Sequence, residues 1–279
     1  MRKIRVLGII GALALFLAGC GGGDDVYVVT GPGLVGLDDS TSDTAPLLTV
    51  TYTVPPDPTQ YTAKILSDLA SDGDIAYDPV LRSYFPTKGP STVWFGIDSL
   101  DANLPEYRAF LTFPLDGATG QDIVPSNAFI VSADVMVFVD FLDFASAVPT
   151  FLDLVQYPPA YGGQNGLGSI DPAGDFNQLP LAIVPVFDFY ASDAGNFVRI
   201  PVTSMMQAAQ VPPALLDFQV RFSRDMSVPP MAPSASSRQP AGVGRTVVPP
   251  PRSMEGIVPF RESATRKPLS AADLAARRR

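Results

Sequence analysis

Apolar residues recur at every second position along several segments of this chain. The clearest are 107–113, 129–139 and 216–222, where Tyr, Phe, Ala, Val and Leu alternate with other residues. Period-two alternation places one side of a β-strand against a core and the other side in water. Shorter runs rich in β-branched and aromatic residues predict further strands, at 47–54, 92–97, 152–157, 181–190 and 197–202.

Helical spacing is scarce by comparison. One short helix is predicted over 205–210, with Ser204 as its cap and Gln207 completing a capping box. Residues 62–69 have the spacing of one or two helical turns, and 162–174 read as a long loop rich in glycine, asparagine and aspartate. Short strands separated by proline, glycine and aspartate are typical of an all-β antiparallel sandwich, which is the fold class we predict.

The N-terminus has the layout of an export signal. A basic start is followed by an apolar stretch over residues 6–18, which is too short and wrongly flanked for a spanning helix. The run Leu17-Ala18-Gly19-Cys20 closes this stretch, and Cys20 is the chain's single cysteine. An ordinary secretory signal with a coincidental cysteine is the alternative interpretation.

These four residues resemble the lipobox of bacterial lipoproteins, in which the cysteine is acylated and the signal is removed. The resemblance implies a signal peptide over 1–19 and lipidation at Cys20, which anchors the protein to a membrane of the bacterial cell envelope. The residue that follows is Gly21 rather than aspartate, and by lipoprotein sorting rules this implies the outer membrane.

Composition divides the rest of the chain into three parts. Residues 20–45 are predicted to form the lipidated cysteine and a flexible tether, 46–225 the β-sandwich, and 226–279 a disordered basic tail rich in proline, arginine and alanine. The tail has two further interpretations. It is a genuine basic segment that lies on anionic lipid or polysaccharide, or an out-of-frame reading of a GC-rich gene.

Charge and missing residue types exclude several functions. The chain has no histidine, so Ser-His-Asp and Cys-His nucleophilic sites and histidine-based zinc sites are excluded. A single cysteine excludes an internal disulfide. Residues 21–223 carry 6 basic and 24 acidic groups, a net of −18, whereas 224–279 carry 10 basic and 4 acidic groups, a net of +6. A domain this acidic repels phosphates, so we expect no nucleic-acid partner.

Four segments of the predicted sandwich carry a family pattern: 74–96, 107–115, 123–139 and 197–204. They resemble strands of the DNRLRE-type domain of bacterial surface proteins, a jelly-roll-like β-sandwich akin to carbohydrate-binding modules. The resemblance implies a non-catalytic module for polysaccharide binding or surface adhesion. The alternative is a structural or assembly module of the envelope that binds a protein partner.

The last strand of such domains has no counterpart after residue 222. Ala45-Pro-Leu-Leu-Thr-Val-Thr-Tyr52, with 33–39 upstream, resembles that missing strand but stands at the N-terminal end. Two interpretations stay open. The domain is circularly permuted and 31–54 fill the edge where the last strand would lie, or 47–53 form an ordinary first strand.

Aspartates dominate the acidic residues and suggest two kinds of site. Glycosidase chemistry needs two carboxylates held across a cleft, and Asp140 lies on the polar face of its strand, so we predict no enzyme. Calcium takes six to eight oxygen ligands and needs no histidine. Asp72, Asp74 and Asp78 cluster at the start of the domain and are the candidate calcium ligands, although solvated turn aspartates are the simpler interpretation.

Sugar-binding sandwiches present exposed aromatic rings beside polar groups. Trp94, the only tryptophan, is out of phase with Val93 and Phe95, so it is expected to project from the face opposite the core. The alternatives are that Trp94 is buried beneath a loop, or that the other face of the strand is the core. Tyr84 and Tyr161, in or beside predicted turns, are the other candidate ligand-binding aromatics.

Overall fold

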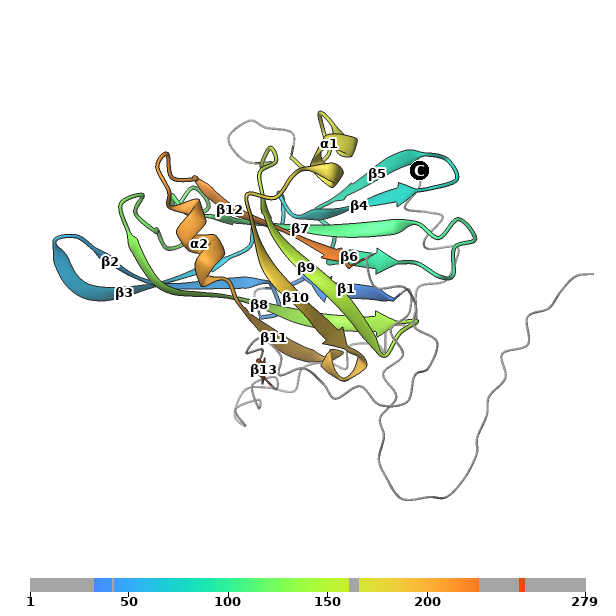
Figure 1. The fold of residues 1–279 in the computed structure, drawn as a ribbon, viewed down its shortest axis with the longest axis horizontal. Helices are drawn as coiled ribbons and strands as arrows, with labels where there is room; N and C mark the ends of the chain where they lie inside the picture. The colour runs from blue at the N-terminus through green and yellow to red at the C-terminus, as the bar shows by residue number, and fades with distance from the viewer. Residues whose placement is uncertain (1–32, 42, 161–165, 226–245, 249–279) are drawn as a thin grey trace, which may run out of the picture.

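The computed structural model describes residues 33–41, 43–160, 166–225 and 246–248, and strands form most of this part of the chain (Figure 1). The strands are β1 (Leu34–Asp38), β2 (Leu47–Val54), β3 (Asp57–Leu66), β4 (Gly73–Asp78), β5 (Ser83–Lys88), β6 (Thr92–Ile97), β7 (Glu106–Pro114), β8 (Phe129–Asp143), β9 (Ala147–Val155), β10 (Ala182–Tyr190), β11 (Asn196–Pro201), β12 (Asp217–Arg224) and β13 (Thr246–Val248). Two α-helices, α1 (Pro172–Asn177) and α2 (Thr203–Ala209), and the 3-10 turn η1 (Ala191–Asp193) complete the described elements.

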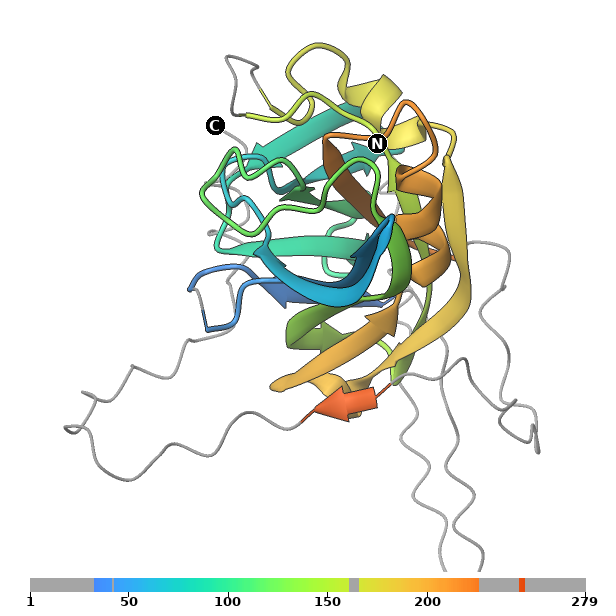
Figure 2. The ribbon, with the colours of Figure 1, turned by 90° about the vertical axis from the view of Figure 1, so that its left-hand side faces the viewer.

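All pairings are antiparallel and join into one curled sheet with the order β10-β9-β12-β7-β6-β1-β8-β11-β13. Strands β4 and β5 extend from β7, and β2 and β3 extend from β8. The sheet turns its corner where β6 meets β7, through the pairs Gly96↔Tyr107 and Ile97↔Glu106. The curl brings two layers face to face (Figure 2), so the predicted all-β antiparallel sandwich is confirmed.

The core lies between the two layers and is built by alternate residues of the strands. Val135, Val137 and Val139 of β8 and Phe218, Val220 and Phe222 of β12 belong to one buried cluster. Helix α2 lies against β8 and β10 and adds Met205, Met206 and Ala209 to the same cluster. The alternation seen along the chain therefore identifies most of the core-facing residues.

Alternation fails at the start of β8. Phe129 and Val131 were predicted to face the core but are 66% and 41% exposed, whereas Ile130 is buried. The pairing of β2 with β8 shifts register between Thr51 and Tyr52. A β-bulge adds one residue to one strand and reverses the side-chain direction beyond it, so the prediction for these two residues was wrong.

The predicted tether was also wrong over its second half. Residues 34–38 form β1, which lies inside the sheet between β6 and β8. Gly36 makes this packing possible, because a Cβ there would come within 2.3 Å of the Phe141 ring. Strand β2 joins the sheet, as both interpretations of 47–53 require. The interior position of β1 contradicts the expectation that this region fills a sheet edge.

Helix predictions were partly correct. Helix α2 lies where it was expected, but its N-cap is Val202, which makes no side-chain cap bond, so the Ser204 cap was wrong. In the segment predicted as helical turns at 62–69, residues 62–66 instead belong to the strand β3 and 67–69 follow it. Helix α1 falls in a predicted loop, where Asp171 accepts a hydrogen bond from the Gly174 N–H at 2.9 Å.

Only three residues of the predicted disordered tail are described, and they form a strand. Thr246–Val248 is β13, which pairs with β11, so the prediction of disorder was wrong for this segment. Cys20, the signal peptide and the rest of the tail lie outside the described residues. In the part of the chain that is described, neither helix has the length and apolar character needed to cross a membrane.

Candidate functional site

Trp94 faces away from Val93 and Phe95, as the alternation predicts, yet it is only 3% exposed. Its ring centroid lies 5.6 Å from that of Tyr107 and 6.0 Å from that of Phe141. Both faces of the sheet are covered at this corner, because β4, β7 and β8 close over the outer side. The expected projection into solvent was wrong: Trp94 is buried among residues of neighbouring strands rather than beneath a loop.

Tyr84 belongs to β5 and is half-buried. Its ring lies 4.8 Å from Tyr77 and 5.2 Å from Phe176, and its hydroxyl accepts a hydrogen bond from the Asn177 amide at 2.9 Å. The side chain thus holds α1 against the sheet. Tyr161, the third aromatic candidate, lies outside the described residues.

The three candidate calcium ligands do not converge on one point. Asp72 accepts the Thr112 N–H at 2.6 Å, and Asp74 accepts the Trp94 N–H at 3.2 Å. Asp78 accepts two backbone N–H groups of its own turn. Within the described ranges, no three carboxylate, histidine or cysteine side chains form a group suited to a metal ion. The predicted site at Asp72, Asp74 and Asp78 was therefore wrong.

Asp72 instead pairs with a carboxyl that was assigned to the tether. Asp39 follows β1 directly, and its exposure is 3% against 0% for Asp72. The Ser67 hydroxyl donates to Asp39 Oδ1 at 3.3 Å, and Asp39 lies close enough to Asp72 for its charge to affect the ionisation of Asp72. The Oδ2 atom of each carboxyl is buried and has no hydrogen-bond partner among the described residues.

Burial changes the titration of this pair. It raises the pKa of Asp39 from 3.8 to about 7. Burial, followed by the nearby charge of Asp39, raises the pKa of Asp72 well above its ordinary range. Two buried carboxyls cannot both ionise easily at short range, so the pair holds a proton to a higher pH than an ordinary aspartate does.

A groove of about 510 Å³ opens between the segment after β9 and the segment that leads into β12. Its lining residues are Gln156, Tyr157, Pro158, Pro213, Ala214, Leu215, Leu216, Asp217 and Gln219. Asp217 is the only charged residue of this lining. Burial, with the negative charges of Asp116 and Asp68, raises its pKa to about 6. The groove thus joins apolar walls to one carboxyl that can accept a hydrogen bond.

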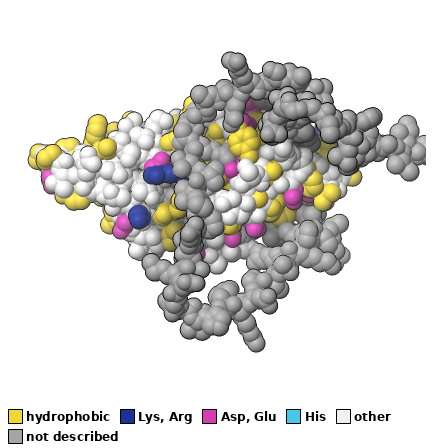
Figure 3. Space-filling model, turned by 90° about the horizontal axis from the view of Figure 1, so that it is seen from below, with side chains coloured by type: hydrophobic (Ala, Val, Ile, Leu, Met, Phe, Trp, Pro, Cys, Tyr) yellow, Lys and Arg dark blue, Asp and Glu magenta, His cyan; other side chains and the backbone are white. Residues whose placement is uncertain are grey.

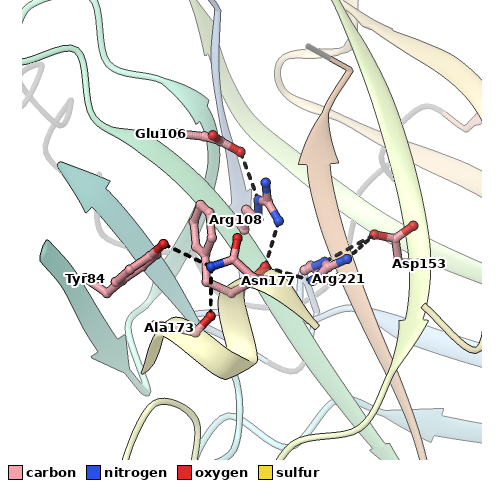
Figure 4. Close-up of polar contacts among 8 residues, drawn as sticks. Tyr84, Glu106, Arg108, Asp153, Ala173, Asn177 and Arg221 are labelled. Carbon is pink, nitrogen blue, oxygen red and sulfur yellow. Dashed lines mark hydrogen bonds and ion pairs between the residues drawn. The ribbon is translucent and has the colours of Figure 1, made fainter. Parts of the chain in front are cut away.

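Two arginines occupy the outer face of the sheet beneath α1 (Figure 4). Arg108 and Arg221 both donate to the Phe176 carbonyl, at 2.7 and 2.8 Å. Arg221 also donates twice to Asp153, from Nε at 3.1 Å and Nη2 at 2.6 Å, in a buried ion pair. The Arg108 guanidinium lies 3.9 Å from the centre of the Phe176 ring. This face is filled by the chain itself, and the arginines position α1.

The two ends of the curled sheet are not covered alike. β11 carries β13 on its outer edge, whereas β10 pairs only with β9 among the described strands. Beside and along β10, apolar side chains reach solvent: Leu181 is 56%, Ile183 54% and Val186 41% exposed. Pro185 interrupts the edge and has no N–H to donate.

Sequence reasoning missed Asp39, Asp153 and Asp217. The first was hidden in a segment predicted as a tether, and no sequence pattern singled out the other two. Arg221 carried a detectable signal, because it stands in the middle of a strand whose alternate residues are large and apolar. A charged residue in the middle of such a strand needs a hydrogen-bonding partner when another segment of the chain covers its face of the sheet.

Comparison of the chain with family models, with curated proteins and with solved structures finds no match.

Proposed function

We propose that this chain is a lipid-anchored protein of the bacterial envelope whose β-sandwich is a non-catalytic module that binds a protein partner. The observation that carries the choice of partner is the row of exposed apolar side chains at β10. Ile183 and Val186 lie on a strand that has one described neighbour, so backbone donors and acceptors are also available there. Edges of this kind bind extended segments of other proteins.

Support for the anchor comes from the lipobox-like run ending at Cys20. Several acyl chains together contribute enough buried CH₂ groups, at about 0.8 kcal/mol each, for stable membrane attachment. Growth with a labelled fatty acid tests this directly. We expect label on the wild-type protein and none on the Cys20→Ser variant, and an unlabelled wild type would contradict the anchor.

Polysaccharide binding is the second candidate, and the groove at Asp217 favours it. Its volume of about 510 Å³ falls in the range of roughly 300–1,000 Å³ typical of small-ligand sites. Gln156 and Asp217 supply polar groups on its lining. Against this candidate, Trp94 and Tyr84 are engaged within the protein, and stacking rings are what sugar sites usually present.

One experiment with two arms separates these candidates. A photo-cross-linking residue is placed at Ile183 of β10 in the full chain within cells. The control position is Leu100, which lies in the turn after β6 and is 72% exposed. The protein-partner proposal expects an adduct from position 183 that Val186→Lys removes and that position 100 does not give. No adduct at 183, or the same adducts at both positions, would reject it.

In the second arm, the purified full chain is screened on a polysaccharide array. If the wild type binds a polysaccharide, Asp217→Asn abolishes that binding and Val186→Lys does not, then the groove is the binding site and polysaccharide binding replaces the protein-partner proposal. The lysine variant is the matched control here, because its side chain is exposed and distant in sequence from the groove lining.

A further inference from the structure

Strand β13 is short and comes from far along the chain. Thr246, Val247 and Val248 stand opposite Arg199, Val198 and Phe197 of β11. Residues 225–245 separate this segment from the end of β12. The sandwich itself is complete without it, because β11 already pairs along its other side with β8.

The pairing contributes few hydrogen bonds and must offset the entropy of joining two positions that lie far apart along the chain. A three-residue ladder offers only a small number of backbone bonds, and each contributes little net stability because water competes for the same groups. Loop closure costs more as the connection lengthens. The small number of backbone bonds and the long connection both bring the occupied and open forms of the β11 edge closer in free energy.

We propose that the outer edge of β11 is a docking site for an extended segment that runs antiparallel to Phe197–Arg199, with residues 246–248 as its resident ligand. The docked segment leaves when a competing strand binds. This site lies at the opposite end of the sheet from β10 and does not depend on the function proposed for that edge.

The chemistry of the segment fits this role. Thr246-Val247-Val248 is entirely β-branched, which favours an extended backbone, and the three prolines that follow have no N–H groups with which to continue a ladder. Its flanking residue Arg245 carries the charge opposite to the net −18 of residues 21–223. Acidic side chains are spread over the face seen from below, the side toward which β11 and β13 lie in Figure 1 (Figure 3).

Hydrogen exchange of the β11 amides tests the resident segment. The full chain is compared with Val247→Pro, which removes one backbone N–H, and with the matched control Val247→Thr, which keeps both the N–H and the β-branching. We expect at least one amide among Phe197–Arg199 to exchange two- to tenfold faster in the proline variant and at the wild-type rate in the threonine variant. Equal rates in all three chains would overturn the proposal.

A labelled peptide of residues 244–250 tests the docking site itself. Because the resident segment lowers the fraction of open edge, the peptide should bind the Val247→Pro chain at least threefold more tightly than the wild type. The same peptide carrying Val247→Pro is the control ligand and should bind neither chain. Equal binding to both chains, or no binding to the proline variant, would reject the edge as a docking site.

Discussion

The buried pair Asp39–Asp72 predicts an unusual dependence of stability on pH. A carboxyl whose pKa is raised in the folded state binds its proton more tightly when folded. The stability it contributes is therefore fully present below its unfolded pKa, near 3.8, and is lost as the pH rises through about 7. Most acidic proteins gain stability over this range, because their carboxylates are paired or hydrogen-bonded.

The magnitude follows from the displacement of one pKa. Each unit corresponds to about 1.4 kcal/mol, so the change from 3.8 to about 7 at Asp39 is worth about 4 kcal/mol in full. Between pH 5 and pH 8 the part that remains to be lost is about 3 kcal/mol. Asp39→Asn removes this titration, and the new amide N–H can donate to Asp72 while its oxygen accepts from Ser67.

The assay is urea unfolding of the full chain at pH 5, 6, 7 and 8, for wild type, Asp39→Asn and the control Asp43→Asn. Asp43 is an exposed carboxyl of the same region, so its replacement makes the same chemical change without the burial. We expect the free energy of unfolding of Asp39→Asn, taken relative to that of wild type, to rise by about 2–3 kcal/mol from pH 5 to pH 8. The difference cancels the contributions of Asp143, Asp175 and Asp217, whose pKa values are also raised by burial.

Two results would refute this reasoning. A difference between wild type and Asp39→Asn that stays constant with pH would mean that Asp39 does not titrate in this range. A pH-dependent difference of the same size in Asp43→Asn would assign the effect to net charge rather than to the buried pair.

Three further predictions follow from buried contacts, each measured by urea unfolding. Asp153→Ala should lower the free energy of unfolding by about 3–5 kcal/mol, because it leaves Arg221 buried without its carboxylate. Asp134→Ala, which breaks the exposed pair with Arg199, should lower it by at most about 1 kcal/mol. Similar losses in the two variants would contradict the burial of the Arg221 pair. Trp94→Ala should cost about 3–5 kcal/mol through the cavity it leaves, and a change below about 1 kcal/mol would show that the ring is not packed. Ser204→Ala should change stability by less than about 0.5 kcal/mol, since Ser204 does not cap α2, and a loss typical of a cap, about 1 kcal/mol, would restore the predicted cap.

Strand positions were largely predictable because they depend on local alternation. The predicted strand at 92–97 coincides with β6, and those at 181–190 and 197–202 match β10 and β11 to within one residue. Helix α1 escaped prediction although Asp171 and Pro172 form a recognisable helix start, because a six-residue helix has too little apolar periodicity to be detected.

The candidate site was much less predictable. Asp39 stands in a short segment with two glycines nearby, and nothing local reveals that β1 is inserted between β6 and β8. The carboxyl ligand set expected from Asp72, Asp74 and Asp78 rested on closeness in sequence. Asp72 and Asp74 instead accept hydrogen bonds from the backbone of β7 and β6, and Asp78 accepts from its own turn.

The sequence by itself determined that this chain forms an antiparallel β fold, which residues of most strands face the core, and which chemistries the absence of histidine excludes. Tertiary structure decided whether the opposite face of each strand meets water or protein. Trp94 and Arg221 have the same sequence pattern as solvent-facing residues, but β4, β7 and α1 cover them. Side-chain direction is a local property of the backbone, whereas cover comes from segments far away in the chain.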